Sequence, residues 1–200
     1  VILHMTGIVL AGGESRRMGR DKAFFTLEGI PLIEHVLRTL RSIFPGIIIV
    51  TNNPAAYAVY DAVVVTDAVD KKGPLTGIYS GLLKSTDEHN FIAACDMPFL
   101  NQDLIAYMAG LANGYDVVVP MIAGRVEPLH AIYSKKLLPS IEKRLQGDAR
   151  QVQGIFGEAR VRYVIETEID LYDPERRSFK NLNTMDEYKE AICLDLECRN

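Results

Sequence analysis

The chain has 200 residues, of which 48% are hydrophobic and 24% charged, enough for one well-buried domain. Its net charge of −4 argues against a general nucleic-acid-binding protein, because such proteins need a basic surface to displace counterions. No apolar run reaches the ~20 residues of a membrane span, and three scattered cysteines make no disulfide framework. We therefore expect a cytoplasmic protein without membrane or nucleic-acid partners, with one domain over residues 5–192 and flexible termini at 1–4 and 193–200.

Continuous apolar runs rich in β-branched residues recur along the chain, with helical stretches between them. The runs are residues 8–10, 47–51, 63–66, 91–95 and 117–120. Because they are continuous rather than alternating, they predict strands buried on both faces, and strands that alternate with helices predict a parallel sheet. The fold class predicted from the pattern is α/β with a mostly parallel central sheet.

Helices are expected between these strands. Residues 32–44 place their apolar side chains on one face, and Gly46 is the expected stop signal. A second helix is expected after Pro74, and a third after Asn101, a typical N-cap. The later segments are 129–133, 135–145 and 161–165. Their less regular pattern predicts mixed strand direction.

A glycine-rich loop with several arginines follows the first expected strand and ends in a lysine. It reads Leu10-Ala11-Gly12-Gly13-Glu14-Ser15-Arg16-Arg17-Met18-Gly19-Arg20-Asp21-Lys22. Glycines let backbone N–H groups approach a phosphate closely, and the basic side chains add cationic donors. The spacing matches neither G-x-x-x-x-G-K-[ST] nor G-x-G-x-x-G. The loop therefore predicts a phosphate-chain ligand held by a third type of loop.

This loop resembles that of the nucleotidylyltransferase superfamily, L-A-G-G-x-S-x-R-M-G followed by a lysine. The version with two glycines most resembles the molybdenum cofactor guanylyltransferases. The resemblance implies a single-domain, three-layer, Rossmann-like nucleotidyltransferase fold. It implies transfer of GMP from GTP to the terminal phosphate of molybdopterin, with release of pyrophosphate. It also implies Mg²⁺ as cofactor, and GTP, molybdopterin and other cofactor-biosynthesis proteins as partners.

The resemblance assigns roles within the loop. Backbone and hydroxyl groups that would bind the nucleotide belong to Leu10, Ala11, Gly12, Gly13 and Ser15. Arg17 and Lys22 are expected to stabilise the negative charge that develops in the transition state, and Lys22 to contact the nucleotide as well. A solvated basic loop is the usual interpretation of isolated lysines and arginines. Four cations inside one glycine-flanked loop make it the weaker interpretation here.

Aspartates follow two of the expected strands, and ligands of an open α/β sheet bind beyond the carboxyl ends of its strands. By spacing alone, Asp96 is equally a Mg²⁺ ligand or a turn residue. The resemblance, in which an aspartate in a D-x-P context holds Mg²⁺, favours a catalytic, nucleotide-binding and metal-binding Asp96. Asp67 by itself is more typical of a turn. It precedes a G-P-L-x-G segment, as a nucleotide-contacting aspartate does in the resembling family.

Asparagines follow the second expected strand, where the resembling family has an asparagine against the nucleotide. Asn52 and Asn53 are both candidates, and Thr51 is a third. The Asn-Asn-Pro sequence also suits a turn that begins a helix.

Residues expected to face the pterin substrate lie late in the chain. Arg150 could meet the pterin phosphate or cap a helix. Asn181 and Asn183 lie in a segment that resembles the family's N-x-N-T-x-[DE]-[DE] element, although Asn183 is also a good helix cap. The family often has a histidine where Glu127 stands. His130 is either its substitute or a structural residue, and the anionic nucleophile of this reaction requires no base.

Two other functions stay open. A cytidylyl- or sugar-phosphate nucleotidylyltransferase is the nearer one, but the resembling cytidylyltransferases read L-A-A-G, so Gly12 favours guanine. A noncatalytic nucleotide-binding protein would keep the glycine loop and tolerate loss of the metal carboxylate. The presence of both Asp96 and Lys22 argues against that function.

Overall fold

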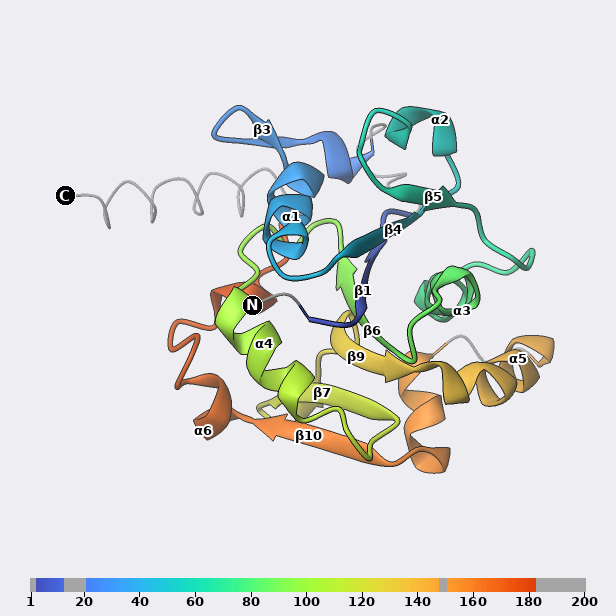
Figure 1. Ribbon diagram of the computed structural model, residues 1–200, viewed down its shortest axis with the longest axis vertical. Coiled ribbons are helices and arrows are strands. Elements are labelled where there is room, and N and C mark those ends of the chain that lie inside the picture. The colour runs from blue at the N-terminus through green and yellow to red at the C-terminus, as the bar shows by residue number, and fades with distance from the viewer. Residues whose placement is uncertain (1–2, 13–20, 148–150, 183–200) are drawn as a thin grey trace.

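A twisted central sheet organises the computed structural model, which describes residues 3–12, 21–147 and 151–182 (Figure 1). The strand order is β10-β7-β9-β6-β1-β4-β5, with β8 beside β7. The strands are β1 Thr6–Leu10, β4 Gly46–Val50, β5 Val63–Val65, β6 His89–Ala94, β7 Val117–Ile122, β8 Arg125–Val126, β9 His130–Ser134 and β10 Val161–Ile165. A separate antiparallel ribbon pairs β2 (Thr26–Leu27) with β3 (Ile30–Pro31).

Strand direction follows the expected pattern. Strands β6, β1, β4 and β5 run parallel to one another, and β10 is parallel to β7. Strand β9 is antiparallel to both β6 and β7. The mostly parallel sheet is therefore confirmed, and so is the mixed direction predicted for the later segments.

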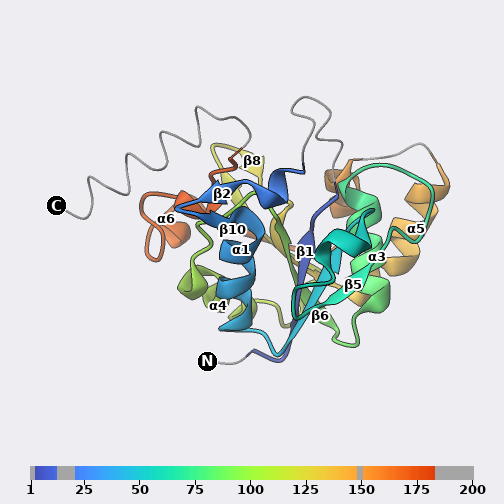
Figure 2. The same ribbon diagram turned by 90° about the horizontal axis from the view of Figure 1, so that it is seen from above.

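Helices cover both faces of the sheet. The α-helices are α1 Leu32–Arg41, α2 Pro54–Tyr57, α3 Pro74–Lys84, α4 Gln102–Gly110, α5 Leu138–Gln146 and α6 Glu166–Ile169. The short 3-10 helices are η1 Lys22–Phe24, η2 Lys135–Leu137, η3 Val152–Glu158 and η4 Arg177–Phe179. Figure 2 shows α1, α4 and α6 on one side of the sheet and α3 and α5 on the other. The three layers of the expected fold class are thus confirmed.

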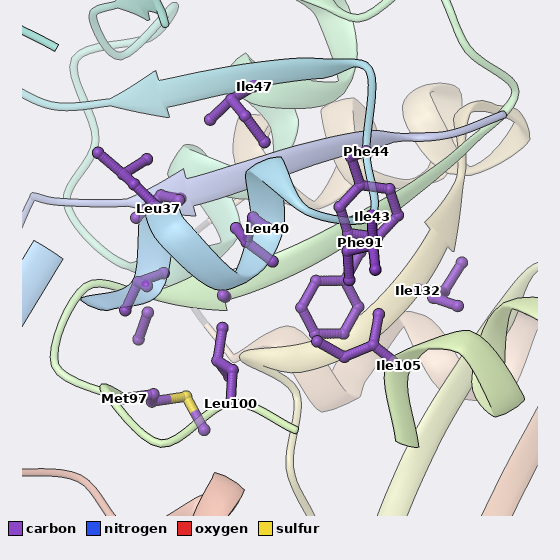
Figure 3. Close-up of a cluster of buried hydrophobic side chains, with 14 of the residues drawn as sticks. Leu37, Leu40, Ile43, Phe44, Ile47, Phe91, Met97, Leu100, Ile105 and Ile132 are labelled. Atoms are coloured by element: carbon purple, nitrogen blue, oxygen red, sulfur yellow. The ribbon is translucent and has the colours of Figure 1, made fainter. Parts of the chain in front are cut away.

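Each face of the sheet has its own hydrophobic core. Side chains of α1 and α4 pack with one strand face, where the Phe44 and Phe91 rings stack with centroids 5.9 Å apart (Figure 3). Side chains of α3 and α5 pack with the opposite face. Continuous apolar strands are required because both faces of the sheet are buried.

Helix boundaries match the sequence signals at some ends and differ at others. Asn101 is the N-cap of α4, and its side-chain oxygen accepts the N–H groups of Asp103 and Leu104 at 2.9 and 3.0 Å. Helix α1 ends at Arg41 instead of Phe44, and the chain leaves it through a turn. Gly46 is not its stop signal but the first residue of β4.

Residues near the amino end contact the core. Leu3, in the segment expected to be flexible, donates its N–H to the Ile43 carbonyl at 2.8 Å and packs against the core. The expected flexible terminus 193–200 lies outside the described residues, and the domain limits stay a prediction. Within the described part of the chain, no helix is both long and apolar enough to cross a membrane.

Candidate functional site

The carboxyl ends of four neighbouring parallel strands lie side by side at one end of the sheet, which we call the strand edge. Gly12 lies just beyond β1, Asn52 beyond β4, Asp67 beyond β5 and Asp96 beyond β6. These four residues are far apart in the sequence, and the strand order β6-β1-β4-β5 makes their connections neighbours. The sequence prediction that these strand ends converge is confirmed.

Backbone hydrogen bonds extend the sheet into this edge. Ala11 donates its N–H to the Val50 carbonyl of β4 at 2.8 Å. On the other side of β1, Cys95 donates its N–H to the Leu10 carbonyl at 3.2 Å. The start of the glycine loop is therefore held between the ends of β4 and β6.

A side-chain hydrogen bond joins the ends of β4 and β5. Asn52 donates from Nδ2 to Oδ2 of Asp67 at 2.9 Å. A Cβ atom on Gly12 would lie 3.7 Å from the same Nδ2, so the amide faces the glycine backbone. Thr51 is buried and its hydroxyl accepts the Asn53 N–H at 3.2 Å. Of the three candidates Thr51, Asn52 and Asn53, it is thus Asn52 whose side chain is hydrogen-bonded to Asp67.

Helix α3 fixes the chain just after Asp67. The buried Ser80 hydroxyl accepts the Ala68 N–H at 2.9 Å and donates to the Thr76 carbonyl at 2.8 Å. Both of its hydrogen bonds are satisfied within the protein. The backbone that carries Asp67 is therefore attached to a packed helix, and sequence patterns gave no sign of this serine.

Asp96 lies half-buried on a turn held from two sides. The next residue, Met97, and Leu100 point into the core (Figure 3). The Asp96 carbonyl accepts the Leu182 N–H at 3.0 Å. This bond also brings the exposed Asn181, one of the expected pterin-facing residues, next to the Asp96 turn.

The side chains around Asp96 suit a metal ion that is bound jointly by the protein and by substrate phosphates. Among residues 3–12, 21–147 and 151–182, no three His, Cys, Asp or Glu side chains gather as a protein cage for a metal ion. Mg²⁺ commonly takes one or two carboxylates and completes its shell with phosphate oxygens and water. A single half-buried carboxylate at the strand edge fits that kind of site.

Lys22 begins the 3-10 helix η1, which Asp21 caps. Oδ1 of Asp21 accepts the Ala23 N–H at 3.1 Å. Oδ2 of the same carboxylate accepts a hydrogen bond from the Tyr57 hydroxyl at 2.6 Å. The loop motif points to Lys22 but to neither Asp21 nor Tyr57, because no motif connects residues 36 positions apart.

Cys95 lies between the charged residues of this edge. Burial is the main cause that raises the pKa of its thiol well above the usual range, and the Asp96 and Asp21 carboxylates raise that pKa further. Lys22 lowers the same pKa. The thiol therefore stays protonated, and the Asp21, Lys22 and Asp96 side chains all lie near enough to Cys95 to change its pKa.

His130 does not face a substrate. Its ring is fully buried, with centroids 5.1 Å from that of Phe91 and 4.9 Å from that of Phe179. Neither ring nitrogen has a hydrogen-bond partner among the described residues, and burial lowers the His130 pKa to about 3. This excludes His130 as a substitute for the family's histidine. The aligned residue, Glu127, is half-buried, and burial raises its pKa.

Several expected site residues lie outside the described residues. They are Gly13, Ser15, Arg17, Arg150 and Asn183. Their roles stay predictions.

A cavity of about 300 Å³ lies elsewhere, on the α3–α5 face. It is lined by Val69, Asp70, Lys71, Tyr79, Glu142, Leu145 and Gln146. None of the expected site residues is in this lining. We place the candidate site at the strand edge, because that is where groups suited to a nucleotide and a metal gather.

Comparison with known proteins decides the family. A family model for the MobA-like NTP transferase domain matches residues 7–162. The chain belongs to the MobA-like NTP transferase family. The molybdenum cofactor guanylyltransferase of Desulfosudis oleivorans is 41% identical over 189 residues, which cover 94% of each chain. A probable molybdenum cofactor guanylyltransferase of Peptoclostridium acidaminophilum is 37% identical and covers 92% of this chain and 87% of its own.

Solved structures agree with this assignment to the MobA-like family. Molybdopterin-guanine dinucleotide biosynthesis protein A from Archaeoglobus fulgidus superposes with a TM-score of 0.85 at 27% identity, covering 96% of this chain and 100% of its own. A 4-diphosphocytidyl-2C-methyl-D-erythritol synthase from Anaerococcus prevotii reaches a TM-score of 0.72 at 14% identity, over 96% of both chains. That second likeness shows a shared fold alone.

Proposed function

We propose that this MobA-like protein transfers GMP from GTP to the terminal phosphate of molybdopterin and releases pyrophosphate. The observation that carries the proposal is the meeting of Gly12, the Asn52–Asp67 pair and Asp96 at one sheet edge. Family membership and relatives named as guanylyltransferases support this chemistry. GTP is an intracellular nucleotide, so we place the reaction in the cytoplasm.

The nucleotide would lie across the ends of β1, β4 and β5. Backbone groups of residues 10–13 and the Ser15 hydroxyl would face its phosphates, as glycine-rich loops do. Beside the oxygen bonded to Asn52, the Asp67 carboxylate has a second oxygen, Oδ1. A carboxylate accepts hydrogen bonds from the N1–H and N2–H groups of guanine, which cytosine does not offer in that arrangement. Asp67 and Asn52 would thus select the base.

The chemical step would be direct displacement at phosphorus. A terminal phosphate oxygen of molybdopterin forms a bond to the α-phosphorus of GTP, and the bond from that phosphorus to the bridging oxygen breaks. Pyrophosphate leaves with that electron pair. Lys22 and Arg17 would stabilise the negative charge that grows on the α-phosphate and the leaving group. The nucleophile is already an anion, so no protein base is needed.

Transferases of this kind use a divalent cation, and we propose Mg²⁺. Asp96 would hold it, with phosphate oxygens and water as the other ligands. When bound, the ion supplies positive charge to the phosphates at the reacting centre.

The pterin substrate would enter from the β6 side. Asn181 lies next to Leu182, whose N–H reaches the Asp96 carbonyl. We propose that Asn181, with Arg150 and Asn183, contacts the pterin or its phosphate. Delivery by another cofactor-biosynthesis protein would protect the labile pterin.

Calorimetric titration of GTP, CTP, ATP and UTP, each with and without Mg²⁺, tests the nucleotide assignment. We expect selective GTP binding that Mg²⁺ strengthens, followed by pyrophosphate release when molybdopterin is added. Preference for CTP would instead indicate a cytidylyltransferase. GTP binding without pyrophosphate release would indicate a noncatalytic nucleotide-binding protein.

A matched pair of lysine variants tests whether the strand edge is the site. Lys22→Met should lower the rate of pyrophosphate release by about 100-fold, because it removes charge stabilisation from the transition state. Lys136→Met is the control, since Lys136 is exposed just after the carboxyl end of antiparallel β9, at the opposite edge of the sheet. Equal rates for the two variants would contradict the assignment of Lys22.

A further inference from the structure

A tyrosine on α2 reaches the capping residue of η1. The Tyr57 hydroxyl donates to Oδ2 of Asp21 at 2.6 Å, a length typical of an O–H group bonded to a carboxylate. The Ala11 carbonyl is a second, longer neighbour of the hydroxyl at 3.4 Å. Tyr57 therefore connects the end of β1 with the start of η1, two segments that flank the phosphate-loop sequence.

The tyrosine is itself rigidly held. Its side chain is fully buried, and its ring centroid lies 5.0 Å from that of Phe24 and 6.3 Å from that of Tyr60. Burial, and then the hydrogen bond to Asp21, raise the Tyr57 pKa above its usual range. The hydroxyl keeps its hydrogen at any working pH, so it remains a donor to the carboxylate.

Asp21 in turn fixes the backbone around Lys22. Its Oδ1 accepts the Ala23 N–H, and its backbone carbonyl accepts the Phe24 N–H at 3.2 Å. The Lys22 carbonyl accepts the Phe25 N–H at 3.0 Å. The backbone of Lys22 is therefore fixed by a cap whose second carboxylate oxygen is bonded to a buried tyrosine.

We propose that Tyr57 and Asp21 are positioning residues for Lys22, and that they hold its ammonium group where phosphate charge develops during nucleotidyl transfer. This inference rests on the proposed function, since it gives Lys22 a role in the chemical step. A packed core residue whose hydroxyl contact is incidental would produce the same static contacts. The two explanations differ in kinetics, because a misplaced cation lowers kcat, whereas lost packing lowers only stability.

A double-mutant cycle between Tyr57 and Lys22 tests the proposal, with wild type, Tyr57→Phe, Lys22→Ala and the double variant in the GMP-transfer assay. Tyr57→Phe keeps the ring and removes only the hydroxyl. We expect it to lower kcat about tenfold while the KM for GTP stays within about threefold. In the Lys22→Ala background, the same change should alter kcat by less than about twofold, because residues that act through one group are not additive.

Two further variants separate positioning from packing. Asp21→Asn keeps an oxygen to cap Ala23 but loses the carboxylate, so it should lower kcat in the same direction as Tyr57→Phe. Tyr107→Phe is the matched control. The Tyr107 hydroxyl donates to Glu168 at 2.5 Å, and this bond joins α4 to α6, which both lie far from α2 in Figure 1. The Tyr107→Phe variant should keep the wild-type kcat, even if its melting temperature falls as much as that of the Tyr57→Phe variant.

The outcomes separate this inference from the proposed function. A tenfold effect of Tyr57→Phe in both backgrounds, or a wild-type kcat with only a lower melting temperature, would overturn the positioning role. Wild-type protein that uses CTP would refute the guanylyl assignment, yet the same cycle run with CTP would still decide on Tyr57. Wild-type protein that turns over none of the four nucleotides would overturn both.

Discussion

The His130 imidazole links the stability of this protein to pH. In the unfolded chain a histidine binds its proton near pH 6.5, but the buried ring does so only near pH 3. Between these values the unfolded chain carries more protons, so lowering the pH lowers the free energy of unfolding. The charge that faces the ring, the buried Asp173 carboxylate, raises the His130 pKa but does not overcome the cost of burial.

His130→Leu should remove this pH dependence. From about pH 7.5 to about pH 5, wild type should lose about 2 kcal/mol more of its unfolding free energy than the variant does, at close to 1.4 kcal/mol per pH unit below pH 6.5. Urea unfolding at the two pH values measures the difference. His4→Leu is the control, since His4 is exposed, and it should follow wild type. A variant that parallels wild type would show that His130 accepts a proton in the folded state.

Asp96 should affect turnover far more than nucleotide binding. Asp96→Asn keeps the shape of the side chain and its place on the anchored turn, but it removes the negative charge that a hard cation requires. We expect GTP to bind with an affinity that no longer depends on Mg²⁺, and pyrophosphate release to fall about 100-fold or more. Calorimetry with and without Mg²⁺ and an initial-rate assay measure the two effects. Turnover at the wild-type rate would refute the metal assignment.

Close packing of α3 on β1 and β4 depends on a residue without a side chain. A Cβ atom on Gly81 would lie 2.6 Å from Cγ2 of Ile8 and 3.4 Å from Cγ2 of Val50. That Ile8 atom is attached next to the backbone, so it cannot move away cheaply. The helix therefore lies nearer to the sheet than an alanine would allow.

Gly81→Ala and Gly110→Ala should change stability in opposite directions. A contact this short should cost about 2–3 kcal/mol, more than the ~1 kcal/mol that alanine gains in a helix. At Gly110, in the last turn of α4, an added Cβ would meet no atom within 4 Å from the other described parts of the chain, so alanine should stabilise the protein by about 0.5 kcal/mol. Urea unfolding of both variants checks the signs. Stabilisation by Gly81→Ala would mean that α3 moves away from the sheet at little cost.

Most strands and helices of the whole molecule could be predicted from sequence, but the two-residue strands could not. Continuous apolar runs indicate strands such as β6, because burial on both faces leaves a strong local signal. Two-residue strands such as β8 and the β2–β3 ribbon have no period to detect. Candidate site residues that lie in motifs, such as Asp96, could be selected from the sequence. Tyr57 could not, because its partner Asp21 is distant in the sequence and shares no pattern with it.

Nucleotide binding should protect one end of the whole sheet from hydrogen exchange. A ligand at about 100 times its dissociation constant stabilises the protein by about 2.7 kcal/mol, and local opening near the ligand is suppressed most directly. With GTP and Mg²⁺, exchange should slow in peptides that cover residues 10–12, 51–53 and 95–97. The control is the peptide over β10, an edge strand whose exchange should change least. Protection centred on Val69, Tyr79 and Leu145 would instead place the nucleotide in the α3–α5 cavity, and it would contradict a site built from the strand ends.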